Sequence, residues 1–256
     1  MKMSQIISLI FIAMALSGCI TTVDGHSERK IDKEKVLSNQ IELGMGYLGQ
    51  KDREAARFHF EKALKVNRNS AEATSGMGLV SQYEGEPELA EKYFKRALKL
   101  KKDFAQGYNN YGSFLYGKNR FDEAYNNFSK AAAVVGYRNR SGALTNLGRA
   151  ALELGRIEKA QASFEHAVKL DPRQSISLIE LADMYFDKED YAEAKKMLDQ
   201  FEKVARSTPR SLWLGLRIEQ IFENRDKAAS YALALKNLHP YSKEYLNYKK
   251  MNKNGR

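Results

Sequence analysis

Cysteine is almost absent from this chain of 256 residues, because Cys19 is the only one. A single thiol forms no intramolecular disulfide and no dithiol redox pair, and it supplies too few ligands for a zinc site. The four histidines are scattered without the spacing of a metal site. The chain also has no Gly-rich phosphate loop and no Gly-x-Ser-x-Gly elbow. These absences predict a protein that is not an enzyme, has no catalytic or metal-binding residues and needs no cofactor.

Long hydrophobic runs are also scarce. The one apolar run covers residues 6–16. Lys2 is the only charged residue before it, and small residues follow it. A positive start, a short apolar core and a small-residue end are typical of a secretory signal. The run is too short to remain as a transmembrane helix, and no later stretch approaches that length.

The signal ends in Leu-Ser-Gly followed by Cys19, which resembles the lipobox of bacterial lipoproteins. The resemblance implies that residues 1–18 are a signal peptide removed before Cys19 and that Cys19 receives acyl chains. Two or more chains are needed for stable anchoring, because one holds a protein only marginally. Ile20 stands where an aspartate usually retains lipoproteins in the inner membrane, which implies the outer membrane. The alternative is a plain secreted protein with a stray thiol.

Basic residues outnumber acidic ones by 42 to 32, for a net charge of +10. No nucleic-acid-binding motif accompanies this charge, and export makes nucleic acid an implausible partner. Residues 19–36 are polar and charged, which predicts a flexible tether. Residues 241–256 contain five basic side chains against one acidic side chain. This basic C-terminal tail is either a solvated, frayed end or a patch that faces a membrane or partner.

The rest of the chain repeats every 34 to 36 residues, in units 37–70, 71–104, 105–140, 141–174, 175–209 and 210–240. Glycine occupies the eighth position of four units, at Gly44, Gly78, Gly112 and Gly148. Alanine occupies the twentieth position of all six, with Ala229 in the last. Phenylalanine occupies the twenty-fourth position of four units, at Phe60, Phe94, Phe128 and Phe164, with Leu198 and Leu233 in the other two.

This pattern resembles the tetratricopeptide repeat, in which each unit is two antiparallel helices. Small residues at positions eight and twenty let the helices approach closely, and the aromatic residue fills the space against the next unit. Pro87 falls where a second helix begins, a position that tolerates proline. The resemblance implies an all-α, right-handed superhelix of about six repeats with a concave inner surface.

In this family the first helix of each unit lines the concave face. The candidate partner-binding residues there are Ile41, Met45, Leu48, Tyr83, Asn109, Asn110, Tyr116, Asn146 and Arg149. Unit one offers an apolar patch for hydrophobic anchors, and asparagine can both donate to and accept from a peptide backbone. Arg149 can pair with a carboxylate. The alternative for Asn110 and Asn146 is that they are merely solvated or cap neighbouring turns.

A lipobox, a short tether and about six repeats together resemble the type IV pilus pilotins, lipoproteins of the PilF/PilW type. Residues 211–217 (SLWLGLR) and 222–231 (FENRDKAASY) resemble the degenerate last repeat of that family. The resemblance implies a lipid-anchored protein on the periplasmic face of the outer membrane. It would bind the secretin subunit of the pilus and promote its localisation and multimerisation, without a small-molecule substrate. The alternative is a scaffold for another envelope complex, serving peptidoglycan hydrolases or outer-membrane protein assembly.

Overall fold

The computed structural model describes residues 32–254, which form thirteen α-helices and no strand. The first helices of the six units are α2 (Lys33–Gly49), α4 (Ala71–Tyr83), α6 (Ala105–Gly117), α8 (Arg140–Glu153), α10 (Ser175–Asp187) and α12 (Pro209–Ile221). The second helices are α3 (Arg53–Val66), α5 (Pro87–Leu100), α7 (Phe121–Ala133), α9 (Ile157–Leu170), α11 (Tyr191–Val204) and α13 (Arg225–Leu238). A further helix, α14 (Lys243–Asn254), follows the last unit.

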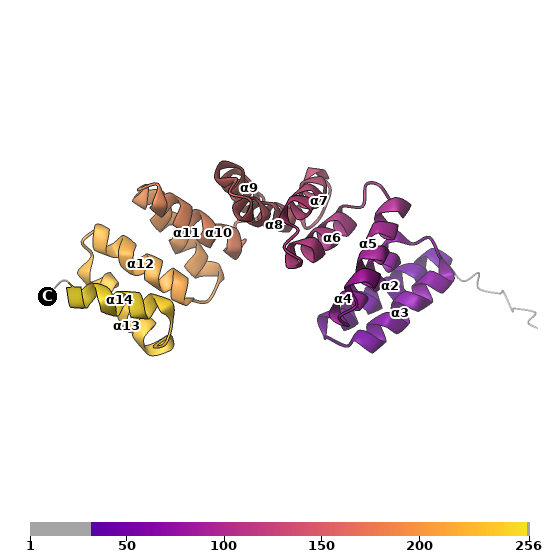
Figure 1. The fold of residues 1–256 in the computed structure, drawn as a ribbon, viewed down its shortest axis with the longest axis horizontal. Helices are drawn as coiled ribbons and strands as arrows, with labels where there is room; N and C mark the ends of the chain where they lie inside the picture. Colours follow the sequence, from indigo (N-terminus) through magenta and orange to yellow (C-terminus); the bar gives the residue numbers. More distant parts are fainter. Residues whose placement is uncertain (1–31, 255–256) are drawn as a thin grey trace, which may run out of the picture.

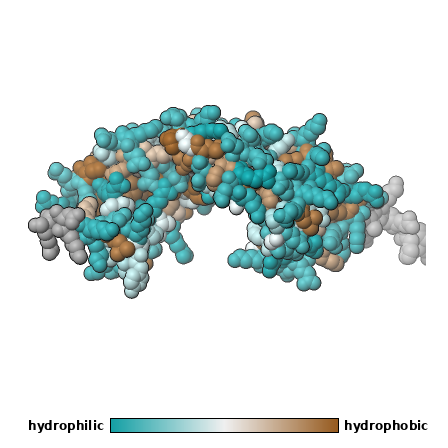
Figure 2. All heavy atoms as spheres, in the orientation of Figure 1, coloured by the Kyte–Doolittle hydropathy of each residue, from teal (hydrophilic) through white to brown (hydrophobic). Residues whose placement is uncertain are grey.

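The units follow one another along an arch, with α2 and α3 at one end and α13 and α14 at the other (Figure 1). The space-filling view shows the hollow on the inner side of this arch (Figure 2). The predicted all-α superhelix of tetratricopeptide repeats is therefore confirmed. Pro87 is the first residue of α5, as the sequence predicts.

Glycine and phenylalanine lock neighbouring helices together. Phe60 is fully buried, and its ring lies so close to two helices that a Cβ atom on Gly44 or Gly76 would approach Cε1 to 2.7 or 2.4 Å. Carbon atoms in normal contact are about 3.5–4.0 Å apart, so only glycine fits at either place. Gly44 belongs to the same unit as Phe60 and Gly76 to the next. One aromatic ring therefore holds three helices, α2, α3 and α4.

Each unit reverses direction at a residue with a left-handed backbone. These residues are Lys51, Gly85, Asn119, Gly155, Glu189 and Glu223, with φ between 56° and 81°. In the first turn the Asp52 N–H donates to the Tyr47 carbonyl and the Lys51 N–H donates to the Leu48 carbonyl. This pair of bonds satisfies carbonyl groups that the end of α2 would leave unpaired. The same pair of hydrogen bonds recurs at the turn of each of the other units.

The sequence-based boundaries were wrong at both ends of the described chain. Residues 33–36, expected in the tether, form the first turn of α2, because the Asp32 carboxylate accepts hydrogen bonds from the N–H groups of Glu34 and Lys35. The basic tail, for which a frayed end and a membrane- or partner-facing patch were the two alternatives, contains α14, which packs on α12 and α13 through Tyr248. The leader and Cys19 lie outside the described residues.

The register of unit six was also wrong in its second helix. Ala229 and Leu233 were expected in the core, but Ala229 is exposed and Leu233 is 57% exposed. The buried residues are Ala228 and Ala232, each one position earlier than expected, together with Leu235. The slip arises because the left-handed turn at Glu223 comes one residue sooner than the expected repeat boundary places it.

Candidate protein-binding surface

The first helices carry a row of amide side chains that bond from one unit to the next. The Asn110 Nδ2 donates to the Ser75 Oγ over 3.1 Å, and its Oδ1 accepts from the Gln106 Nε2 over 2.7 Å. The Asn146 Nδ2 donates to the Asn109 Oδ1 over 3.1 Å. These bonds join α4 to α6 and α6 to α8, so the predicted asparagines hold successive first helices in register. The Asn146 Oδ1 accepts no hydrogen bond from the part of the chain that the structure describes.

Next to this row, Tyr116 links the third and fourth units. Its hydroxyl donates to the Glu153 Oε1 over 2.8 Å, and the Arg149 guanidinium lies 4.8 Å from the centre of its ring. Burial, together with the hydrogen bond to Glu153, raises the pKa of Tyr116. The hydroxyl therefore stays protonated at neutral pH and remains a donor.

Units five and six are joined by Arg210, which the sequence analysis did not single out. Its Nη1 and Nη2 each donate to the Glu180 carboxylate over 2.8 Å, and its Nε donates to Asp183. A guanidinium binds a carboxylate well in this two-pronged geometry. Burial raises the pKa of Asp183, while Arg210 opposes that shift. These two carboxylates of unit five are thus paired with an arginine of unit six.

A second arginine, Arg217, covers aromatic rings in the same region. Its guanidinium carbon lies 4.0 Å from the centre of the Phe186 ring and 5.9 Å from that of Trp213. Cation–π contacts of this kind add to packing. Both arginines lie on the first helix of unit six, and nothing in the sequence of that unit alone reveals their partners in unit five.

Exposed apolar side chains lie on unit one and at the adjoining end of α4 in unit two. Met45 is 42% exposed and Tyr83, at the end of α4, is 60% exposed. A hollow between α2 and α4 is lined by Leu48, Gly49 and Tyr83 with Lys51 and Arg53 at its edge. Met45 precedes Gly49 by one helical turn and so lies on the same side of α2. This combination of exposed Met45, exposed Tyr83 and a basic edge suits an apolar segment with acidic flanks.

The predicted residues divide into exposed and buried groups. Met45 and Tyr83 are exposed, while Ile41, Asn110, Tyr116, Asn146 and Arg149 are half-buried. Leu48 and Asn109 are only 9% and 8% exposed, so they have little side-chain surface free for a partner, although Leu48 still lines the hollow between α2 and α4. Leu48 packs with Phe60 and Val80, and Asn109 is covered where α8 lies beside α6. Both are buried because the next unit stacks over them.

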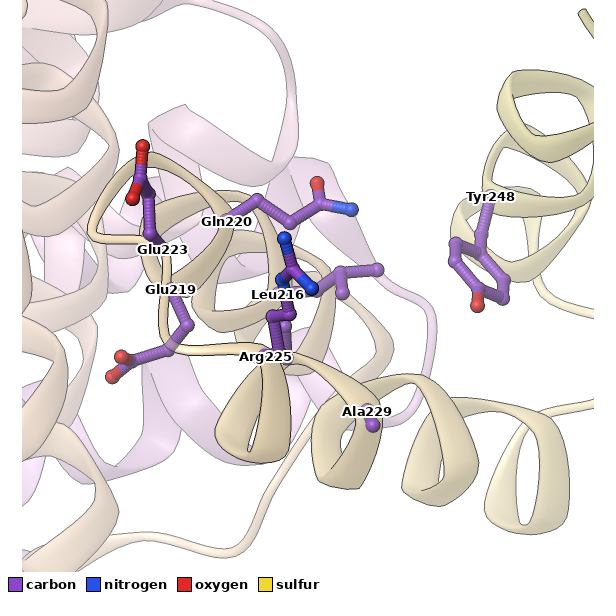
Figure 3. Close-up of a pocket in the computed structure, with 8 residues that line it drawn as sticks. Leu216, Glu219, Gln220, Glu223, Arg225, Ala229 and Tyr248 are labelled. Atoms are coloured by element: carbon purple, nitrogen blue, oxygen red, sulfur yellow. The ribbon is translucent and has the colours of Figure 1, made fainter. Parts of the chain in front are cut away.

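The other end of the arch has a cleft of its own (Figure 3). It lies where α12, α13 and α14 meet and is lined by Leu216, Glu219, Gln220, Glu223, Arg225, Ala228, Ala229 and Tyr248. Figure 3 shows Tyr248 of α14 facing the other lining residues from across the cleft. The carboxylate of Glu219 is almost fully buried and pairs with Lys195 and, at 3.6 Å, with Lys227. Burial opposes ionisation there, but the two lysines hold the pKa of Glu219 below its usual range.

Within residues 32–254, no group of three or more histidine, cysteine, aspartate or glutamate side chains is arranged to hold a metal ion. None of the described helices combines the length and the apolar character needed to span a bilayer. The features that the described surface does offer are grooves, apolar patches and paired charges. These features suit recognition of another polypeptide.

Sequence models of the tetratricopeptide repeat match residues 39–70, 75–104, 103–173 and 145–213. The fold and its inner surface are thus those of a tetratricopeptide-repeat scaffold. The type IV pilus assembly protein PilF of Pseudomonas aeruginosa is 36% identical over 241 residues, 93% of this chain and 95% of that protein. The chain belongs to the PilF family of type IV pilus biogenesis proteins, which confirms the resemblance drawn from the sequence.

Solved structures agree with this assignment. The structure of Pseudomonas aeruginosa PilF superimposes with a TM-score of 0.81 at 35% identity, covering 86% of this chain and 99% of that one. PilW, described as a widely conserved type IV pilus biogenesis factor, gives a TM-score of 0.68 at 27% identity, covering 84% and 98%. The similarity therefore extends over nearly the whole of both relatives.

Proposed function

We propose that this protein is an outer-membrane lipoprotein that binds the secretin subunit of the type IV pilus. It promotes the localisation of that subunit to the outer membrane and its assembly into a multimer. Its anchor is acylated Cys19, and it faces the periplasm. It works by binding alone, without catalysis, a cofactor, a small-molecule substrate or nucleic acid. The proposal is supported by 36% identity across 93% of the chain to a type IV pilus assembly protein.

The surface that we assign to the client is the apolar face formed by unit one and the end of α4 in unit two. The observation that carries this assignment is the exposure of Met45 and Tyr83 beside the hollow between α2 and α4. Large exposed apolar side chains next to a groove are typical of protein-binding sites. Methionine is also flexible enough to fit an apolar anchor closely. Lys51 and Arg53 at the edge favour client segments that carry acidic residues beside the apolar ones.

The inner face continues from this apolar start into the polar row of Asn110 and Asn146. An extended client segment that enters at unit one would next meet the half-buried amides, whose unused oxygen and N–H atoms can pair with a peptide backbone. Lipid attachment confines the protein to the membrane and so raises the effective concentration of a bound client there. Binding and confinement together are sufficient for the proposed activity.

The test of the binding site is Met45→Glu, measured by titrating the purified protein with the secretin subunit. Burying a charge in an apolar contact is costly, so we expect affinity to fall by about tenfold or more. Val135→Glu is the matched control, because Val135 is 79% exposed in the connection between α7 and α8. Both variants should retain the wild-type helical content. Equal affinity of Met45→Glu and Val135→Glu for the secretin subunit would remove unit one from the site.

The test of the anchor is Cys19→Ala, followed by separation of membrane and soluble fractions. Loss of the acyl chains should move the protein out of the outer-membrane fraction, because a single short leader cannot replace two or more chains. Circular dichroism of the variant should be unchanged, since every described helix begins after Cys19. A protein that stays with the outer membrane after this substitution, even through a high-salt wash that removes electrostatic contacts, would refute the lipid anchor and leave the client-binding proposal standing.

A further inference from the structure

The helix α14 has an outer face on which three lysines lie without acidic partners. Lys243, Lys249 and Lys250 are exposed, and none of them forms an ion pair with any residue that the structure describes. The spacing of 243, 246, 249 and 250 places these lysines and Leu246 along one side of the helix. Tyr248 is half-buried and packs on α12 and α13, away from Lys243. Tyr245 is also half-buried and borders the lysine face, with the Lys249 Nζ 5.8 Å from the centre of its ring.

Large apolar side chains accompany these lysines. Tyr241, just before α14, is 93% exposed, and Leu246 in the middle of the lysine face is 47% exposed. Met251, in the last turn, is 40% exposed. By sequence, residues 239–256 carry five lysines or arginines and one glutamate, a net charge of +4 (5 − 1) out of +10 for the whole chain. Positive charge and exposed apolar groups are thus concentrated near the C-terminal end of the sequence.

We propose that the outer face of α14 docks on an anionic lipid surface. Lysines beside an anionic bilayer attract its headgroups, and interspersed tyrosine and leucine side chains enter the boundary between headgroups and acyl chains. The face is convex and mostly lysine, whereas the centre of a protein interface is depleted of lysine and enriched in arginine and aromatic anchors. These features favour a lipid surface over an acidic protein as the occupant.

This contact lies at the opposite end of the arch from α2, which follows the proposed tether (Figure 1). A lipid contact at α14 gives the protein a second point of attachment, far from unit one. With both ends held, the hollow of the arch is directed along the membrane surface. The inference concerns only α14, and it does not depend on secretin binding or on acylation of Cys19.

The experiment measures binding of the purified chain from residue 20 onward to lipid vesicles by sedimentation. This chain lacks the leader and the lipid attachment site but keeps every described helix. The vesicles contain phosphatidylcholine alone or phosphatidylcholine with phosphatidylglycerol. We expect binding only to the vesicles with phosphatidylglycerol, and we expect added salt to weaken it. No binding to either kind of vesicle would overturn the proposal.

The variant K243Q/K249Q/K250Q should bind the anionic vesicles at least about tenfold more weakly, because each lysine near such a surface contributes about fivefold. Its matched control is K65Q/K99Q/K169Q, which removes the same charge from exposed lysines in the last turns of α3, α5 and α9. The control should bind as the wild type does. Equal losses in the two variants would show that overall charge, and not α14, governs binding, and would refute the inference.

Two further measurements separate a lipid surface from any polyanion. Leu246→Ser keeps all charges and should still weaken vesicle binding by a few fold, because Leu246 enters the bilayer interface. Binding to polyglutamate should be weaker than binding to vesicles of equal charge. Unchanged vesicle binding by Leu246→Ser, or equally tight binding to polyglutamate, would instead identify an acidic polymer as the partner. Thermal unfolding of each variant verifies that α14 remains in place.

Discussion

Gly148→Ala is a small change that the packing between α8 and α9 should resist. An ideal Cβ atom at Gly148 would lie 2.5 Å from the Phe164 Cε1, whereas carbon atoms in contact are about 3.5–4.0 Å apart. The ring or the helix must therefore move by about 1 Å. Phe164 is fully buried among Ala151, Ala160 and Leu178, so it has little room to move.

The expected size of the effect follows from two opposing contributions. Overpacking a core in this way costs about 1–3 kcal/mol. Alanine in place of a helical glycine contributes about 1 kcal/mol in the opposite direction. Gly148→Ala should therefore lower the free energy of unfolding by up to about 2 kcal/mol. Gly46→Ala is the matched control, because nothing lies within 4 Å of the added Cβ atom and only the helical gain of about 1 kcal/mol remains.

A second substitution tests the cause of the clash. Phe164→Leu removes the ring atoms that approach residue 148, so Gly148→Ala should become favourable in its presence. Unit five already has this combination, with Ala182 and Leu198 both buried at the corresponding positions. We expect a coupling free energy of at least about 1 kcal/mol between the two substitutions.

The assay is urea unfolding followed by far-ultraviolet circular dichroism, applied to the wild type, the control, both single variants and the double variant. If Gly148→Ala stabilises the protein as much as Gly46→Ala does, or if the two changes are additive, the account of glycine and aromatic packing is wrong.

Two electrostatic predictions accompany this one. Arg120, with help from Lys95 and Tyr111 and against the effect of burial, lowers the pKa of Glu91 from 4.5 to about 2. A depressed pKa stabilises the folded state above pH 4.5, and that contribution is lost as the pH falls toward 2. The variant Glu91→Gln should therefore be less stable than the wild type at neutral pH, and its stability should change less between pH 4.5 and pH 2. Parallel pH dependences of the two proteins in urea unfolding would contradict this. Lys195→Met should cost about 3 kcal/mol because it leaves the buried Glu219 carboxylate with Lys227 alone. Adding Glu219→Gln should recover most of that loss in the same assay, whereas no recovery would show that Lys195 acts through packing.

The architecture was predictable because its determinants recur at fixed spacing. Gly148 and Phe164 are sixteen residues apart, as are Gly44 and Phe60, and each pair brings the same two helices into contact. The start of α2 could also have been predicted, because aspartate is a favoured N-cap residue and Asp32 occupies that position. The last unit was less predictable, because its turn at Glu223 comes one residue earlier than the spacing of the other units predicts.

The surface was harder to predict than the core. Leu48 and Asn109 occupy positions that face inward on an isolated unit, but the stacking of the next unit buries them. The partners of Asn146 and Arg210 lie in neighbouring units, about 30 to 40 residues away in sequence. A pattern read within one repeat does not reveal such pairs. The packing of α14 was hidden for the same reason, because it rests on contacts of Tyr248 with α12 and α13.

In the described chain, helices contact only those of their own or an adjacent unit, and α14 contacts only the last unit. Within the described residues, no helix crosses the hollow to fix the distance between the two ends of the arch. The distance between the two ends of the arch is therefore set only by the contacts between successive units, and small rotations at each of these contacts add up. We therefore expect the arch to widen or narrow through small rotations between adjacent units while each helix stays intact.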